Sequence, residues 1–255
     1  GGYGIHVDSP SGGGTVRIKG VTIESARIGI RLDGECSCCY ITSAEIQDNT
    51  IYNAGPYGML VDSVDALSIE RNVVTGADAV GVSTNCIDSQ RMTDNVINST
   101  GNTGYSTGNN NSLVFSGNSI TMGPNASGAY MNVTGAGNVF NNSIIGVTPT
   151  GAGTSGIIYC GAGGQLVNNA VRGFETSIHI PDQSIGNTVY RNSCTGATNG
   201  ILVYGDLNTF DNNILTGNSV GLNFTSLATG NVYSGNRANS LYVINPGNTN
   251  GGSNF

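Results

Sequence analysis

The stretch Ile46-Gln-Asp-Asn49-Thr-Ile51 sets a pattern, apolar-x-x-Asn-x-apolar, that recurs along the whole chain. The clearest further copies are Ile69-Glu-Arg-Asn72-Val-Val74, Met92-Thr-Asp-Asn95-Val-Ile97 and Phe115-Ser-Gly-Asn118-Ser-Ile120; the pattern continues at Asn142, Asn169, Asn192, Asn212 and Asn236, and Val21 takes the Asn place in the first copy. The ten markers are separated by 28, 23, 23, 23, 24, 27, 23, 20 and 24 residues. A period of about 24 residues is typical of a solenoid, in which each repeat forms one coil on the last.

Each repeat contains a second short strand, which usually begins with a glycine. Examples are Gly4-Ile-His-Val7, Gly29-Ile-Arg-Leu32, Gly58-Met-Leu-Val61 and Gly200-Ile-Leu-Val203. Short strands between Gly/Asn/Ser turns predict parallel coils about 4.8 Å apart, so ten coils make a rod roughly 45–50 Å long. Asn at one place in every coil can bond to the Asn above and below, and it tolerates the left-handed backbone of a sharp corner. The repeat pattern is weak in residues 100–111, which are predicted to form a loop or a distorted coil.

The composition excludes several classes of protein. Only 10% of the residues are charged and the net charge is −7, while 38% are hydrophobic, so the chain is not a charged disordered protein. The 40 glycines exclude a helical bundle, because glycine is a poor helix former. No apolar run approaches the ~18 residues of a membrane span. An isoelectric point near 4.5 argues against a nucleic-acid partner.

The repeat N-x-I…G-I-x-V…I-x-x-N-x-I resembles that of right-handed parallel β-helix proteins of the pectate-lyase-like superfamily, which include NosD-type proteins, polysaccharide lyases and epimerases, and phage tailspikes. The resemblance implies an all-β right-handed parallel β-helix of about ten coils. We expect a single domain over residues 1–255, ending in a Gly/Asn-rich tail at 245–255, and a fragment of a longer chain.

For function, the resemblance implies a polysaccharide-recognising and polysaccharide-degrading protein, such as a tailspike depolymerase or a secreted lyase or hydrolase. Such a protein lies outside the cell or on a virion surface. The alternative is a non-catalytic shaft, fibre or adhesin segment that self-associates through an apolar outer face. A shared fold by itself does not choose between these functions.

The middle residue of the inner strand should point outward, because its neighbours point inward. That column reads His6, Arg31, Leu60, Gly81, Tyr130, Ile158, His179, Leu202, Asn223 and Tyr242. Half of these residues are large and apolar, which indicates that a loop of the same chain, neighbouring chains or an elongated ligand covers the face. The resemblance to tailspikes implies a homotrimer.

The position two residues before the ladder Asn carries aromatic side chains in neighbouring coils. Phe140, Val167, Tyr190 and Phe210 occupy it in succession. Sugar rings stack on aromatic faces through their C–H faces, so Phe140, Tyr190 and Phe210 are candidate substrate-binding residues. Packing in the core or at an interface is the alternative.

Acidic residues close three consecutive copies of the inner strand. These residues are Asp8, Asp33 and Asp62, with Ser83 next in line. Two carboxylates about 5–5.5 Å apart suit a retaining glycosidase, and like charges at this distance raise one pKa. The three residues are therefore candidate catalytic groups. The alternative is that each Asp only begins a turn by bonding the backbone two residues on.

The same region contains the candidate metal ligands. By resemblance to polyuronate lyases of this fold, Asp33, Glu35, Asp62 and Asp65 could bind Ca²⁺, whose ligands are oxygen atoms. No other cofactor is predicted.

Cysteine and histidine add little. Cys36, Cys38 and Cys39 could form a local disulfide, and Cys194 occupies an inward core position. His6 and His179 lie some seven coils apart and are predicted to be separate surface or interface residues.

Overall fold

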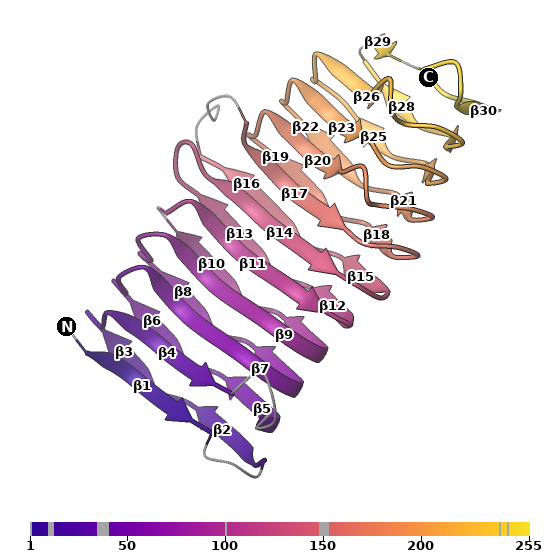
Figure 1. Ribbon diagram of the computed structural model, residues 1–255. Coiled ribbons are helices and arrows are strands. Elements are labelled where there is room, and N and C mark those ends of the chain that lie inside the picture. Colours follow the sequence, from indigo (N-terminus) through magenta and orange to yellow (C-terminus); the bar gives the residue numbers. More distant parts are fainter. Residues whose placement is uncertain are drawn as a thin grey trace.

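The computed structural model describes residues 2–9, 13–34, 41–99, 101–147, 153–239, 241–243 and 245–255. These residues form a rod of stacked coils that runs from the amino-terminal to the carboxy-terminal end of the chain (Figure 1). Its strands form a 20-stranded sheet and a 10-stranded sheet, and the strands of the described residues pair in parallel. The prediction of a parallel β-solenoid of about ten coils is therefore confirmed. Nowhere in the described ranges is there a helix long and apolar enough to cross a membrane.

Each coil contributes strands to three faces, of which the first and second belong to the larger sheet. The first face contains β1 (Tyr3–Asp8), β4 (Ile28–Asp33), the first halves of β7 (Tyr57–Glu70) and β9 (Val80–Thr93), β11 (Thr103–Asn110), β14 (Ser127–Val133), β17 (Ser155–Cys160), β20 (Thr176–Ile180), β23 (Asn199–Val203), β26 (Val220–Phe224) and β29 (Leu241–Val243). The second face contains β2 (Thr15–Lys19), β5 (Ile41–Gln47), the second halves of β7 and β9, β12 (Ser112–Ser116), β15 (Gly137–Phe140), β18 (Gln165–Val167), β21 (Thr188–Tyr190), β24 (Thr209–Asp211), β27 (Val232–Ser234) and β30 (Thr249–Gly252).

The third face is the 10-stranded sheet, with one short strand from each coil. Its strands are β3 (Thr22–Glu24), β6 (Thr50–Tyr52), β8 (Val73–Thr75), β10 (Val96–Ser99), β13 (Ser119–Met122), β16 (Ser143–Gly146), β19 (Ala170–Arg172), β22 (Ser193–Thr195), β25 (Ile214–Leu215) and β28 (Arg237–Ala238). The inward side chains of the three faces fill a continuous apolar core along the rod.

A ladder of asparagine side chains links the coils where the second face turns into the third. The Nδ2 of Asn95 donates to Asn118 Oδ1 at 3.0 Å and to the carbonyl of Ile69 at 2.9 Å, and the backbone N–H of Asn95 donates to the same Oδ1 at 3.0 Å. The rungs are Asn49, Asn72, Asn95, Asn118, Asn142, Asn169, Asn192, Asn213, Asn236 and Asn254. Val21 begins the ladder by donating its backbone N–H to Asn49.

The structure corrects two details of this corner. The rung predicted at Asn212 is Asn213, because Asn192 Nδ2 donates to Asn213 Oδ1 at 3.0 Å. The left-handed backbone belongs to the residue before each rung, such as Asp48, Arg71 and Asp94, with φ of 55°, 54° and 56°. The preceding residue turns the chain, and the ladder Asn can therefore direct its amide along the stack.

A second ladder, which the repeat analysis missed, lies where the first face turns into the second in the carboxy-terminal half. Asn187 Nδ2 donates to Asn208 Oδ1 at 3.0 Å, and Asn231 Nδ2 donates to Asn248 Oδ1 at 2.9 Å. The backbone N–H of Asn208 links the two pairs through Asn231 Oδ1 at 2.8 Å. Residues 245–255 contribute a rung to each ladder and a strand, β30, that pairs with β27.

The glycines that precede the inner strands stack because the coils approach closely there. A Cβ on Gly29 would lie 2.5 Å from the carbonyl oxygen of Gly58 and 2.5 Å from Ile51 Cγ2, closer than atoms can pack. The same clash would occur at Gly58 and Gly81 in the next coils. The repeated glycine is therefore required by packing between coils.

The stretch 100–111 was predicted to be a loop or a distorted coil. Most of it is strand β11, whose pairing with β14 shifts in register between Thr107 and Asn110, so the coil is distorted there. Tyr105 and Thr107 point inward and are buried, which preserves the alternation of a strand despite the polar composition. They lie in a buried polar region in which Thr84 Oγ1 donates to Gln90 Oε1 at 3.0 Å. The inward position of Cys194 is confirmed, since it is fully buried and pairs with Val171.

We expect Asn118→Ala to lower the free energy of unfolding by about 2–4 kcal/mol, because it leaves the buried backbone N–H of Asn95 without an acceptor and removes the side-chain bonds of Asn118 to Asn95, Asn142 and the Met92 carbonyl. Asn138→Ala is the matched control, since Asn138 is exposed on β15, and should change stability by less than about 0.5 kcal/mol. Denaturant unfolding followed by circular dichroism measures both. Equal stabilities of the two variants would contradict the structural role of the ladder.

Candidate functional site

The acidic residues at the end of the first face stack in register. Asp8 pairs with Asp33, and Asp33 pairs with Asp62. The next residue in the column is Asn85, whereas Ser83, the predicted successor, lies opposite Leu60. The inner strand of this coil is displaced by two residues from the predicted alignment, because Val82 pairs with Met59 rather than with Val61.

Basic side chains separate the first two carboxylates. His6 Nε2 lies 2.8 Å from Asp8 Oδ1 and 3.2 Å from Asp33 Oδ2, and Arg31 Nε lies 2.5 Å from Asp33 Oδ2. Arg31 Nη1 also donates to the Tyr3 hydroxyl at 2.9 Å, and the Tyr3 ring lies 4.5 Å from the His6 ring. The hydrogen bond to Asp33 raises the pKa of Arg31. His6 and Arg31 were not predicted to belong to this site, although both stand two residues before an Asp of the column.

The third carboxylate has a different environment. Asp62 Oδ1 accepts hydrogen bonds from Ser63 Oγ and Asn85 Nδ2, both at 3.2 Å. Asp62 thus contacts a hydroxyl and an amide, whereas Asp33 contacts a guanidinium and an imidazole. Stacked carboxylates of one sequence motif therefore occupy two chemically different sites.

The predicted Ca²⁺ ligands fit a calcium ion poorly. Glu35 lies outside the described residues, and Asp65 lies beyond the left-handed corner at Ser63, on the second face. The guanidinium of Arg31 on Asp33 places a positive charge where a cation would bind. Within the described ranges, His6, Asp8 and Asp33 are the three side chains whose possible ligand atoms lie within 4.8 Å of one another. The Arg31 guanidinium contacts Asp33 in this group as well.

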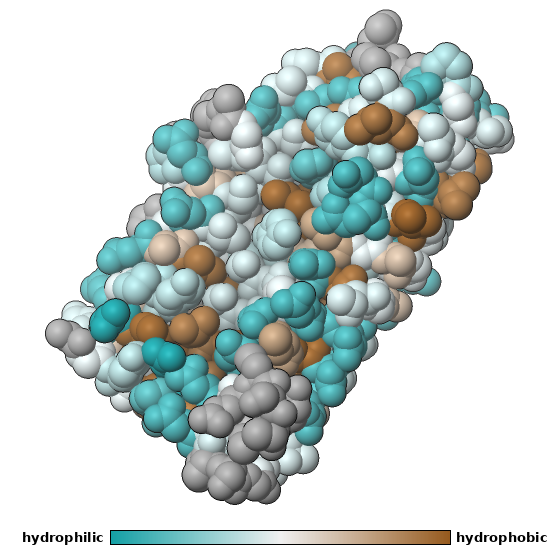
Figure 2. Space-filling view, viewed as in Figure 1, coloured by the Kyte–Doolittle hydropathy of each residue, from teal (hydrophilic) through white to brown (hydrophobic). Residues whose placement is uncertain are grey.

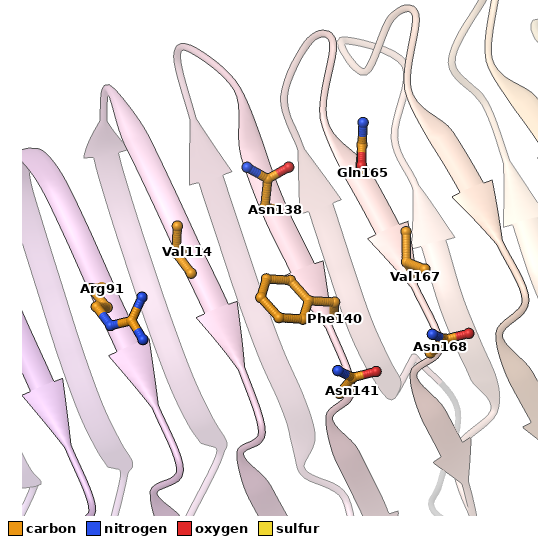
Figure 3. A pocket seen from close by; sticks show the side chains of 8 residues that line it. All are labelled: Arg91, Val114, Asn138, Phe140, Asn141, Gln165, Val167 and Asn168. Carbon is orange, nitrogen blue, oxygen red and sulfur yellow. The ribbon is translucent and has the colours of Figure 1, made fainter.

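The second face has a groove across four coils (Figure 3). Its volume is about 580 Å³, and its lining comes from β9, β12, β15 and β18 with the corner residues that follow the last two. The lining residues are Arg91, Val114, Asn138, Phe140, Asn141, Gln165, Val167 and Asn168.

The lining combines a half-buried apolar floor with exposed amides. Val114, Phe140 and Val167 are half-buried, whereas Asn138 and Gln165 are exposed. The side-chain amides that line the groove make no side-chain hydrogen bond to any described residue, and they can therefore bond to a ligand. An aromatic ring beside such amides offers both an apolar surface and hydrogen-bonding groups for hydroxyls.

The predicted aromatic ladder is only partly present. The outward column reads Phe140, Val167, Tyr190 and Asp211, so Phe140 lines the groove and Tyr190 lies one coil beyond Val167. Phe210 was predicted to belong to this ladder, and this prediction is wrong: it is fully buried and pairs with Val189. Counting from Asn212 instead of Asn213 shifts the strand by one residue, which reverses the side that each side chain faces.

The acidic column and the groove are separate. Phe140 pairs with Ser116, Ser116 pairs with Thr93, and Thr93 pairs with Glu70, so the column of Phe140 meets β7 at Glu70. Asp62, the last acid of the acidic column, lies eight residues earlier on the same strand. The left-handed corner at Ser63 lies between these two residues, so the acidic column and the groove belong to different faces of the rod. The two features are therefore independent candidate sites.

The outward column of the first face contains an apolar stretch in its carboxy-terminal half. Tyr130, Ile158, His179 and Leu202 follow one another in consecutive coils, and Tyr130 is 36% exposed. Burial lowers the pKa of His179. Gly81 does not belong to this column, because Ser83 pairs with Leu60; the side chain of Tyr242 lies outside the described residues. Figure 2 shows apolar patches interrupted by polar ones on the side of the rod that it displays.

Comparison with known proteins agrees with this geometry. Residues 3–169 match the protein family described as right handed beta helix region. The chain belongs to this family. No curated protein matches the β-helix by sequence.

Two solved structures share the fold of this β-helix. The Dettilon tailspike protein gp208 has a TM-score of 0.57 and 15% identity over 95% of this chain and 58% of its own. Tailspike protein 3 of bacteriophage CBA120 has a TM-score of 0.55 and 12% identity over 93% of this chain and 51% of its own. The β-helix thus spans between half and three fifths of these tailspike chains, and at such identities the likeness shows the fold alone.

Proposed function

We propose that this β-helix binds a polysaccharide in the groove of its second face. The observation that carries the proposal is the lining, in which the Phe140 ring lies beside unbonded amides such as Asn138 and Gln165. The structural likeness to two phage tailspikes supports a location outside the cell or on a virion surface.

The shape of the groove suits a chain molecule rather than a small compact ligand. It crosses four coils, which corresponds to about 14 Å along the rod at the spacing of parallel strands. The Phe140 ring stacks on the C–H face of one sugar, while the amides bond to hydroxyls on either side. Because the groove lies open on the face of the rod, the polymer can extend beyond it toward Tyr190.

We expect Phe140→Ala to weaken polysaccharide binding about tenfold or more, because the stacking surface is lost. Tyr52→Ala is the matched control, since Tyr52 is an exposed aromatic residue on the third face. Affinity electrophoresis against a panel of polysaccharides measures the binding. If Phe140→Ala binds as the unmodified chain does, the groove is not the glycan site.

We also infer that the acidic column cleaves the polymer. Asp33 and Asp62 stand on adjacent coils, at a backbone spacing of about 4.8 Å that suits a retaining pair. Asp33, oriented by Arg31 and His6, would attack the anomeric carbon, and Asp62 would protonate the leaving oxygen. Asp8 would position His6 from the other side.

We expect Asp33→Asn and Asp62→Asn each to lower the rate of polysaccharide cleavage at least about 10²-fold, as loss of an acid–base group does. Asp65→Asn is the control, because Asp65 lies beyond the Ser63 corner. Release of reducing ends from a bound polysaccharide measures cleavage. Full activity in both variants would remove these residues from the mechanism.

A self-associating shaft is the second candidate function. The stretch Tyr130, Ile158, His179 and Leu202 supports it, because four neighbouring coils present large side chains outward on one line. Contact between copies along this line would remove apolar surface from water. The resemblance to tailspikes implies three copies.

We expect the chain to sediment as a homotrimer and Leu202→Glu to sediment as a monomer, because a charge in the contact is not compensated. Leu227→Glu is the control, since Leu227 is 63% exposed in a turn. Analytical ultracentrifugation over a range of concentrations measures the mass. A monomer at every concentration would contradict self-association.

A further inference from the structure

We propose that the polysaccharide in the groove is anionic and that Arg91 binds its acidic group. This inference rests on the proposed binding of a polysaccharide in the groove, and it adds the chemical class of the ligand.

The lining of the groove contains one charged residue, and that residue is basic. Arg91 accompanies two valines, one phenylalanine and four amide side chains, with no carboxylate. No acidic residue occurs in the sequence between Asp94 and Glu175, so the coils that form most of this groove contribute no carboxylate to it. The neighbouring acids Asp94 and Asp211 lie outside the lining, one at the corner of β9 and one on β24.

One edge of the Arg91 guanidinium, the one that carries Nε, is hydrogen-bonded to a neighbouring carboxylate. Its Nε donates to Glu70 Oε1 at 3.3 Å. Glu70 also accepts from Ser68 Oγ at 2.8 Å and from Arg71 Nη1 at 3.2 Å, so two arginines share one carboxylate. The hydrogen bond from Ser68, together with Arg91 and Arg71, lowers the pKa of Glu70. Arg71 is also paired with Asp48, which accepts from Arg71 Nε at 2.7 Å and from Arg71 Nη2 at 3.2 Å. Glu70 therefore orients Arg91 through its Nε edge and offsets part of its positive charge.

The other edge of this guanidinium is available to a ligand. Nη1 and Nη2 of Arg91 have no hydrogen-bond partner among the described residues, and the side chain is 60% exposed. Figure 3 shows the guanidinium turned along the face toward Val114, into the groove. Two parallel N–H groups on one edge of a guanidinium match the two oxygens of a carboxylate, or those of a sulfate.

A second arginine stands beyond the other end of the groove. Arg191 follows β21 and lies 4.7 Å over the ring of Tyr190, with no ion-pair partner in the described part of the chain. Four coil steps separate it from Arg91, which corresponds to about 19 Å along the rod. A polymer with repeated acidic groups can reach both arginines, whereas a single small anion cannot.

The experiment compares binding to carboxylated, sulfated and neutral polysaccharides, namely polygalacturonate, dextran sulfate and dextran. We expect the unmodified chain to bind one or both anionic polymers, and Arg91→Gln to lose about 10- to 100-fold in affinity for them. Arg91→Lys should retain part of the affinity, and added salt should weaken binding by screening. Arg172→Gln is the matched control, because Arg172 is an exposed arginine on the third face that forms no ion pair with any residue the structure describes.

The variants separate failure of this inference from failure of the proposed function. If Phe140→Ala weakens binding and Arg91→Gln does not, the groove binds a glycan and the anionic class is wrong. If dextran binds as strongly as the anionic polymers, the anionic class is also wrong. If neither variant changes binding, or no polymer binds, both the groove and the anionic ligand are excluded. If Arg91→Gln and Phe140→Ala lose affinity for the anionic polymers and Arg172→Gln retains it, both the glycan groove and the anionic ligand are supported.

Discussion

The structure depends on the alignment of each coil with the next, and the asparagine ladder enforces that alignment. Each ladder amide accepts from the backbone and the side chain of the Asn in the preceding coil, so a coil displaced by one residue would leave several buried polar groups without partners. The corner residue before the rung supplies the left-handed turn. Together they place equivalent positions directly above one another, and every other feature of the rod follows from these columns.

Stacking brings like residues to within a few ångströms, and the chain handles this in two ways. In the acidic column, the basic side chains His6 and Arg31 stand two residues before Asp8 and Asp33 and contact their carboxylates. Repulsion between neighbouring acids is thereby reduced. On the second face, the groove avoids the problem with valines, amides and one aromatic ring. The first arrangement provides paired titratable groups, and the second provides an uncharged surface that ends in an arginine.

The stacking of Asp8, Asp33 and Asp62 and the column of Phe140 and Tyr190 follow the predicted repeat, and the misplacement of Phe210 and Ser83 comes from alignment within a coil. Placing the rung at Asn212 instead of Asn213 put Phe210 outside, although it is buried, while the columns of Phe140 and Tyr190 were placed correctly. The predicted alignment paired Val82 with Val61, which placed Ser83 after Asp62 in the acidic column. In the structure Val82 pairs with Met59, and Asn85 takes that place. A shift of one residue reverses inside and outside, whereas a shift of two moves a side chain along the strand.

A period that repeats in every coil predicts the solenoid, its number of coils, the ladder and the stacking of Asp8 on Asp33 and Asp62. The contacts of those side chains are defined only once the coils are stacked. The contact of His6 with Asp33, the orientation of Arg91 by Glu70 and the groove beside Phe140 arise between residues more than 20 positions apart. Such contacts depend on which residues of neighbouring coils lie side by side, and a periodic pattern does not specify the partner of an individual side chain.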